Sequence, residues 1–237
     1  MNSRVIYEIP DLEKQISLFE YFLGLNEKFR NSLYIEYPDL KDNDLNEFVR
    51  SLYQTKKNEV VSIKEDAQEN WVDVEEKVLG EFSKILQKEW KLESIPGGIS
   101  FLPLSTRDLK EKRCDVYFKK DIPSILKTTT HELFHFIYFD KWKDIFSDTS
   151  TEKMDYPNPT WALSEIALPI ILNNSKVKDI LGMEFKDYPM FENEKYDGES
   201  IVLHIQKIYG ENGVEDFLKE SYEYILKYYE SRNSCNE

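Results

Sequence analysis

Apolar residues recur at helical spacing over most of the chain, which predicts a mostly helical protein. In residues 10–35 they return every three or four positions behind Asp11, a residue suited to cap a helix. After a break the same spacing returns over residues 45–53 and 69–92. We therefore expect packing helices to fill the N-terminal region, residues 1–94.

The pattern becomes extended after Ile95-Pro96-Gly97-Gly98, a run that we expect to end the preceding helix. Residues 99–104 predict a strand that ends near its proline. Residues 114–118 predict a second strand, and the charged run 107–113 is expected to connect the two. A small sheet thus precedes the second half of the chain.

A helix is predicted over residues 125–139, directly after these strands. Asp121 is suited to be its N-cap, and Pro123 falls in the first turn, where its missing N–H costs nothing. One broad face of this helix carries Ser124, Thr128, His131, Glu132 and His135, and apolar residues lie around the back. The polar set would therefore stand on a helix anchored in the core.

The C-terminal region returns to helices after a polar stretch, residues 140–159, that predicts a loop. Residues 160–172 form an apolar helix that its proline is expected to kink or shorten. One helical turn is expected at 177–181, and longer helices at 199–209 and 214–232.

These elements predict an α+β fold that is mostly helical. We expect a single compact unit over residues 1–237, with an N-terminal helical region (1–94), a sheet with one helix (95–141) and a C-terminal helical subdomain (142–237). The chain has no internal repeat, and its 8 glycines are too few for a flexible tether between domains.

The composition and charge of the chain exclude some classes of binding partner. The formal charge of −14 argues against nucleic-acid or anionic-membrane partners, since both need a basic patch. No apolar run reaches the roughly 20 residues of a transmembrane helix, and residues 1–11 carry charges where a signal peptide would be apolar. Cys114 and Cys235 offer no disulfide framework. These features predict a cytoplasmic protein, and they leave its oligomeric state open.

The clearest chemical signal is His131-Glu132-Leu133-Phe134-His135. The chain has only 3 histidines, and two of them lie in this run. Residues four apart share a helical face, so both imidazoles can bind one metal ion, and Glu132 can reach a metal-bound water. Two imidazoles and a carboxylate suit zinc.

A catalytic zinc usually has three protein ligands, so a third is needed downstream. Glu165 is our candidate because it lies in the predicted helix over 160–172 among apolar residues. A carboxylate in such surroundings is costly to bury unless a cation or a metal accompanies it. The alternative is a helical glutamate that faces solvent.

The combination of His131-Glu132-x-x-His135 with Trp161-x-x-Ser164-Glu165-x-Ala167 resembles the gluzincin (zincin) metallopeptidases. Their M1 and peptidase-MA-like branches carry HExxH followed by a W-x-x-E-G-x-A element. The segments 196–202 and 208–210 extend the likeness, which covers roughly residues 97–220.

The resemblance implies a zincin-like catalytic core that hydrolyses a peptide or protein substrate. Carried onto this chain, it makes His131, His135 and Glu165 the Zn²⁺ ligands, Glu132 the general base and Tyr196 the partner of the oxyanion. It also implies that the strand over residues 114–118 presents a sheet edge to the extended substrate.

This chain departs from the family pattern in ways that bear on activity. Ile166 replaces the glycine after the ligand glutamate, and the 140–159 loop would be an insertion. M1 aminopeptidases bind the substrate's amino terminus through a G-x-M-E-N glutamate, whereas residues 97–101 here contain no acidic residue. We therefore expect a metallopeptidase that is not an aminopeptidase.

Other interpretations stay open at this point. The chain could be a latent or non-catalytic zincin-like binding or regulatory protein whose cleft is covered by the N-terminal helices. A metal-independent interaction protein would require Glu165 to lie far from both motif histidines. His204 could be a core histidine or an outer partner of the zinc site. Cys114 could be a buried side chain or a thiolate that blocks the metal.

Overall fold

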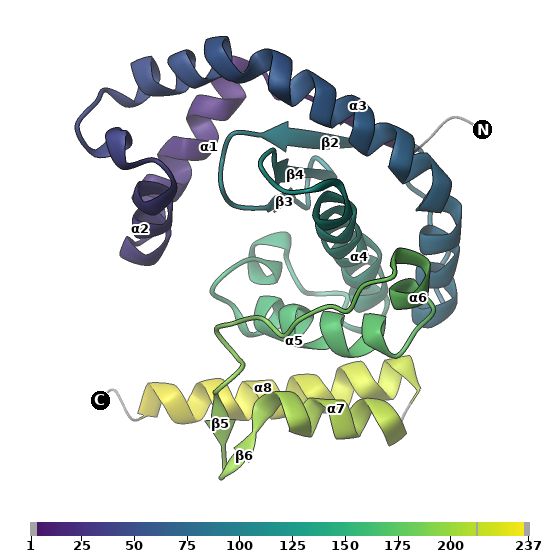
Figure 1. Cartoon of the computed structure of the whole chain (residues 1–237). Coiled ribbons are helices and arrows are strands. Elements are labelled where there is room, and N and C mark those ends of the chain that lie inside the picture. Colours follow the sequence, from purple (N-terminus) through teal and green to yellow (C-terminus); the bar gives the residue numbers. More distant parts are fainter. Residues whose placement is uncertain (1–3, 212, 235–237) are drawn as a thin grey trace. The chain divides into compact units, whose positions relative to one another are not determined.

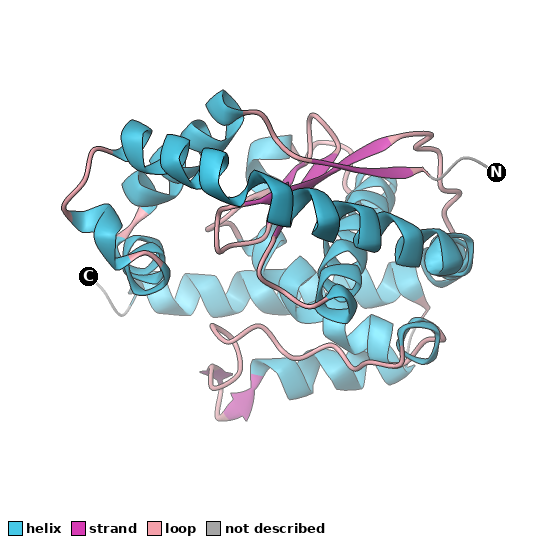
Figure 2. Cartoon of the chain, turned by 45° about the horizontal axis from the view of Figure 1, so that its top comes forward, coloured by secondary structure: helices cyan, strands magenta, loops and turns pink. Residues whose placement is uncertain are grey.

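A computed structural model describes residues 4–211 and 213–234, so Cys235 lies outside the described residues. The chain is mostly helical with a small sheet (Figures 1 and 2), which confirms the predicted α+β class. Its contacts divide it into two compact units, residues 1–75 with 92–132 and residues 76–91 with 133–237. Within the described ranges, no helix has both the length and the apolarity to cross a membrane.

The early part of the first unit contains helices α1 (Leu12–Leu25) and α2 (Glu27–Glu36) and a short 3₁₀ helix (Pro38–Lys41). Asp11 caps α1 as predicted, and its side chain accepts from the Lys14 N–H at 2.8 Å. The single helix predicted over 10–35 is wrong, because Asn26 has extended backbone and caps α2 with its own side chain.

Helix α3 (Leu45–Leu86) joins the two helices predicted over 45–53 and 69–92. The intervening residues are mainly polar, but they include good helix formers and keep a narrow apolar stripe. Val60 and Ala67, seven positions apart, are both fully buried. A stripe that thin is easily missed in sequence. Helix α3 begins in the first unit and ends in the second.

The sheet of the first unit has strand order β1-β2-β4-β3. Strands β1 (Val5–Glu8), β2 (Ile95–Ser100) and β4 (Arg113–Tyr117) are parallel, and β3 (Thr106–Asp108) is antiparallel to β4. The sequence did not predict β1 or β3. The prediction that the strand over 114–118 forms an edge is wrong, because β4 is paired on both sides.

Strand β2 begins at Ile95, so the glycine pair lies inside a strand rather than in a break. A methyl group on Gly98 would stand 1.7 Å from Asp115 Oδ1, and one on Gly97 would stand 3.0 Å from the Tyr7 ring. Both glycines therefore serve close packing over the sheet.

Side chains of α3 satisfy the outer edge of β1. The Tyr7 N–H donates to Gln68 Oε1 at 2.8 Å, and the Val5 N–H donates to Glu75 Oε1 at 2.7 Å. Gln68 Nε2 also donates to the Val5 carbonyl at 3.1 Å. An uncovered edge invites pairing with another chain, so α3 protects this side of the sheet.

The second unit consists mainly of helices. It contains the later part of α4 (Ile122–Ile145), followed by a short 3₁₀ helix (Thr151–Met154), α5 (Pro159–Asn173), α6 (Val177–Leu181), α7 (Ile201–Glu211) and α8 (Val214–Ser234). The predictions of α5, α6 and α8 are confirmed to within a few residues. Helix α5 forms the centre, with every residue from Thr160 to Leu172 buried.

Two parts of the second unit differ from the prediction. Helix α4 continues into the expected 140–159 loop because Trp142 and Phe146 pack on Tyr222 of α8, with ring centroids 4.8 and 5.3 Å away. A hairpin of β5 (Lys195–Tyr196) and β6 (Glu199–Ser200) precedes α7. Its turn residues, Asp197 and Gly198, have φ of 51° and 81°, as two-residue hairpin turns require.

Candidate metal centre

The first turn of α4 has the cap and the proline that the sequence predicts. Asp121 caps it, accepting from the Ser124 N–H at 2.9 Å. Pro123 lies in its first turn. Further along, Leu133, Phe134 and Phe136 are fully buried, so the helix is fixed by apolar packing.

One row of residues across the sheet lies beneath the first part of α4. The strand register aligns Tyr7, Gly97, Cys114 and Arg107 side by side. Tyr7 shares a 2.6 Å hydrogen bond with Thr129 of α4. The register therefore determines which side chains lie closest to the motif, although Arg107 and Cys114 come from different strands.

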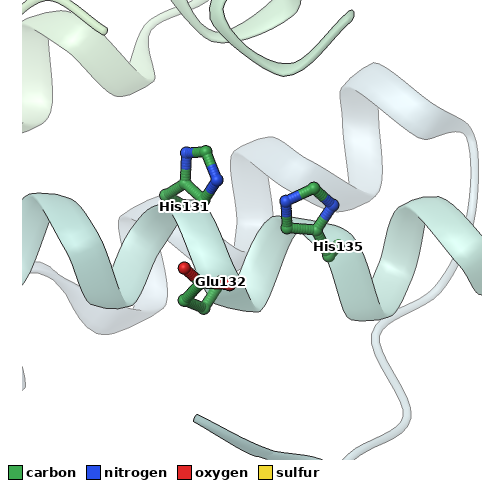
Figure 3. Close-up of side chains that lie close together, drawn as sticks. All are labelled: His131, Glu132 and His135. Carbon is green, nitrogen blue, oxygen red and sulfur yellow. The ribbon is translucent and has the colours of Figure 1, made fainter. Parts of the chain in front are cut away.

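His131, Glu132 and His135 form the one group that meets the geometric condition for a metal site among the described residues, with ligand atoms all within 4.8 Å of one another. The two imidazoles lie on the same side of α4, and the Glu132 carboxylate lies on the other side of the ribbon (Figure 3). His135 is fully buried and stacks on Phe139, with centroids 5.9 Å apart. Its ring orientation is thus set by packing.

Glu132 faces an arginine that sequence reasoning missed. Arg107 Nη1 of β3 lies 3.5 Å from Glu132 Oε2, and the two side chains are only 10% and 8% exposed. This ion pair is shielded from solvent, so it is stronger than a surface pair. The sequence predicts a connection at position 107, and only the register of β3 brings Arg107 to the helix.

Cys114 is a free, fully buried thiol in the same row. Burial raises its pKa well above the usual range, and the negative charge of Glu132 raises it further. The neutral thiol is therefore the stable form. This favours the buried-side-chain interpretation over a thiolate that blocks a metal.

Lys120 is a second cation near the motif that the sequence did not single out. Its Nζ donates to Thr128 Oγ1 at 2.9 Å and to Ser105 Oγ at 3.1 Å. Burial lowers its pKa, and the charge of Glu132 partly opposes that effect. A lysine just before a helix carries no pattern that would have marked it.

Glu165 is buried in α5, at 2% exposure, which rules out the solvent-facing alternative. Its Oε1 lies 3.5 Å from His135 Nε2, and both residues belong to the second unit. Glu165 is not part of the three-residue group described above. The structure thus brings it to His135, the second histidine of the motif.

The remaining candidates lie elsewhere in the second unit. The Tyr196 ring packs edge-on against Tyr224 and Tyr228 of α8, at 5.4 and 6.3 Å. His204 Nδ1 lies 2.8 Å from Glu199 Oε2, and its half-exposed ring stacks on Tyr224 at 3.9 Å. His204 is therefore not the core histidine that its apolar helix face suggested. Its partners are Glu199 and Tyr224.

The motif on α4 brings two imidazoles and a carboxylate together, Arg107 of β3 pairs with Glu132, and Glu165 of α5 contacts His135. Such a set is suited to bind a divalent cation and to move a proton.

No model of a known protein family, no curated protein and no solved structure matches this chain.

Proposed function

We propose that this chain is a zinc-dependent metallopeptidase of the gluzincin type and that it is not an aminopeptidase. One observation carries the proposal. His131, Glu132 and His135 lie within 4.8 Å of one another, and the buried carboxylate of Glu165 lies 3.5 Å from His135.

The donor set fits zinc by its chemistry. Neutral imidazoles and a carboxylate are the ligands that catalytic zinc takes. Burying a carboxylate in an apolar helix costs free energy, and a cation shared with His135 would offset that cost. His131, His135 and Glu165 would hold the ion. When bound, zinc would polarise the peptide carbonyl and lower the pKa of water toward about 7.

Glu132 would act as general base and then as general acid. Its carboxylate would take the proton of the attacking water and pass it to the leaving amine. Arg107, 3.5 Å from Glu132, would hold that carboxylate in one orientation. The oxyanion role of Tyr196 rests on the family resemblance alone and stays a prediction, to be tested by Tyr196→Phe.

An extended peptide would bind beside β3 (Thr106–Asp108), the outer strand next to β4. Main-chain pairing with an outer strand positions a peptide, and alternate side chains then give specificity. Strand β3 thus takes the substrate-pairing role that the resemblance gave to the strand over 114–118, which is internal to the sheet.

The test combines metal analysis with cleavage of an internally quenched peptide whose amino terminus is acetylated. The wild type should hold about one zinc per chain and cleave this peptide. Glu132→Gln should keep the zinc and lose about 10²- to 10⁴-fold in rate, the usual contribution of a general base. Glu223→Gln, at an exposed position of α8, is the matched control and should change neither. A zinc-free chain, or full activity in Glu132→Gln, would refute the proposal.

A non-catalytic or latent zincin-like protein is the second candidate. The observation that favours it is the burial of Glu132, which is 8% exposed and paired with Arg107. This candidate predicts zinc in both wild type and Glu132→Gln and cleavage by neither. Removing residues 1–92 would be a poor test of latency, because it deletes β1 from the sheet and the end of α3 from the second unit.

A further inference from the structure

We propose that Lys120, with the hydroxyls of Ser105 and Thr128, forms a subsite that binds a carboxylate of the substrate. The inference rests on the proposed peptidase function and deepens it. It assigns the enzyme to peptides that carry a carboxylate close to the cleaved bond. All three residues belong to the first unit.

The hydrogen bonds leave donors for an anion. The Lys120 ammonium donates to Thr128 and Ser105, at 2.9 and 3.1 Å, and an ammonium has three N–H groups. Ser105 accepts one of these bonds, so its own hydroxyl hydrogen can point to another acceptor. Thr128 donates to the Ser124 carbonyl at 2.8 Å, which fixes its hydroxyl as an acceptor for Lys120. The site thus offers one N–H and one O–H.

Lys120 forms no ion pair within the described residues. Its hydrogen-bond partners are neutral hydroxyls, and the nearby carboxylate of Glu132 is paired with Arg107 instead. Two other buried cations in this protein each contact a carboxylate: Arg113 meets Asp115 at 2.7 Å, and Lys141 meets Glu215 at 2.6 Å. A half-buried ammonium without such a partner costs free energy, which an anionic ligand would recover.

The position relative to the motif indicates which part of the substrate would bind. Thr128 precedes His131 by three residues and Glu132 by four, so it lies about one helical turn before the motif on α4. One turn is about 5.4 Å, and an extended peptide advances about 3.3 Å per residue. A carboxylate at Lys120 would therefore lie within one or two residues of the cleaved bond. It would be either the substrate's own C-terminal carboxylate or an Asp or Glu side chain.

Binding of short fluorescein-labelled peptides to the full chain tests the subsite without relying on turnover. The probes are an alanine hexapeptide with a free carboxyl terminus, its amide, and the amide with one central Glu or Gln. Fluorescence anisotropy should show about tenfold tighter binding for one carboxylate peptide than for its neutral partner. If the free-acid and amide peptides differ in affinity, the bound carboxylate is the carboxyl terminus. If the Glu and Gln peptides differ in affinity, it is the side chain.

Variants connect that preference to Lys120. Lys120→Met should reduce the ratio to about one, and Lys120→Arg, which keeps the charge, should retain most of it. Lys119→Met is the matched control, because Lys119 is one residue away and pairs with Glu36 at 2.6 Å. It should leave the ratio unchanged. Equal affinities for all peptides, or equal losses in the two Met variants, would overturn the proposal.

The outcomes also separate the subsite from the peptidase. Cleavage of neutral amidated peptides with no carboxylate preference would support the peptidase and refute the subsite. A preference that depends on Lys120, in a chain that cleaves nothing, would support the subsite and refute the peptidase.

Discussion

The two buried carboxylates of the candidate centre lie in very different surroundings. Glu132 faces the sheet, where Arg107 pairs with it, whereas Glu165 lies in the apolar helix α5 against His135. A guanidinium is charged at every relevant pH, but an imidazole is charged only when protonated. The protein therefore neutralises the first carboxylate by itself. A metal ion shared with His135 would neutralise the second.

The same contrast extends across the units. In the sheet, Arg113 contacts both Asp115 and Glu8, so two further acidic side chains have a permanent cation beside them. In α5, every residue from Thr160 to Leu172 is buried, and Glu165 is the acidic member of that run. These acidic side chains of the sheet are thus neutralised by an arginine of the same unit, whereas an external cation would act at Glu165.

Arg107→Met should produce the largest effect, because it leaves Glu132 buried without its cation. Removing one partner of a buried pair costs about 3–5 kcal/mol of unfolding free energy. Urea denaturation measures this cost. The double variant Arg107→Met with Glu132→Gln should recover most of it, since no unpaired charge remains. A loss below about 1 kcal/mol in the single variant would mean that the pair is solvated like a surface pair.

Zinc should stabilise the wild type by about 2.7 kcal/mol at a free concentration 100 times its Kd. Calorimetric melting with zinc and with a chelator measures the difference. Glu165→Gln should lose this stabilisation and Glu132→Gln should keep it, since only the former removes a proposed ligand. The reverse result would assign the third ligand to Glu132, which also lies within 4.8 Å of both histidines.

Gly98→Ala should disturb the charges of the sheet without altering a charged residue. Its new methyl group would stand 1.7 Å from Asp115 Oδ1 and displace that carboxylate from Arg113. We expect a loss of about 1–3 kcal/mol in urea denaturation. Gly80→Ala, in α3 with open space around it, is the control and should stabilise by up to about 1 kcal/mol. Equal effects of the two variants would show that the Asp115 contact is unimportant.

The sequence predicted those elements whose apolar stripe is wide enough to identify them. The prediction of α5 and of the buried position of Glu165 is confirmed, because a carboxylate surrounded by apolar neighbours can be recognised in the sequence. Helix α4 is confirmed in its first part only, since it extends to Ile145. Strands β1 and β3 were missed, since they are only 4 and 3 residues long. Strand β1 also pairs with residues that lie about ninety positions away in the chain.

The residues around Glu132 could not have been predicted for a related reason. Arg107 and Cys114 reach the motif only through the register of three strands, and no local pattern encodes that register. Lys120 belongs to a turn, where polar residues are expected in any case. By contrast, the i, i+4 spacing of His131 and His135 depends on one helix alone, so the sequence predicts their shared face without knowledge of the sheet.

The smallest predicted effect concerns Cys114, the neutral member of the row that includes Arg107. Burial raises its pKa in the folded chain, whereas the unfolded thiol titrates near about 8.5. The folded state therefore holds the thiol proton more tightly, so the stability contributed by Cys114 is complete below about pH 8.5 and is lost as the pH rises.

Between pH 7 and pH 9.5 the free energy of unfolding of the wild type should fall by about 1.4 kcal/mol relative to that of Cys114→Ala, in which this titration is absent. Comparing the two proteins at each pH by urea denaturation cancels the tyrosines, which titrate in both. A difference that stays constant with pH would mean that Cys114 ionises in the folded protein as readily as in the unfolded chain. Its surroundings would then resemble those of a metal-binding thiolate, and the contrast between charges neutralised within the sheet and the proposed metal site would fail at the row beneath α4.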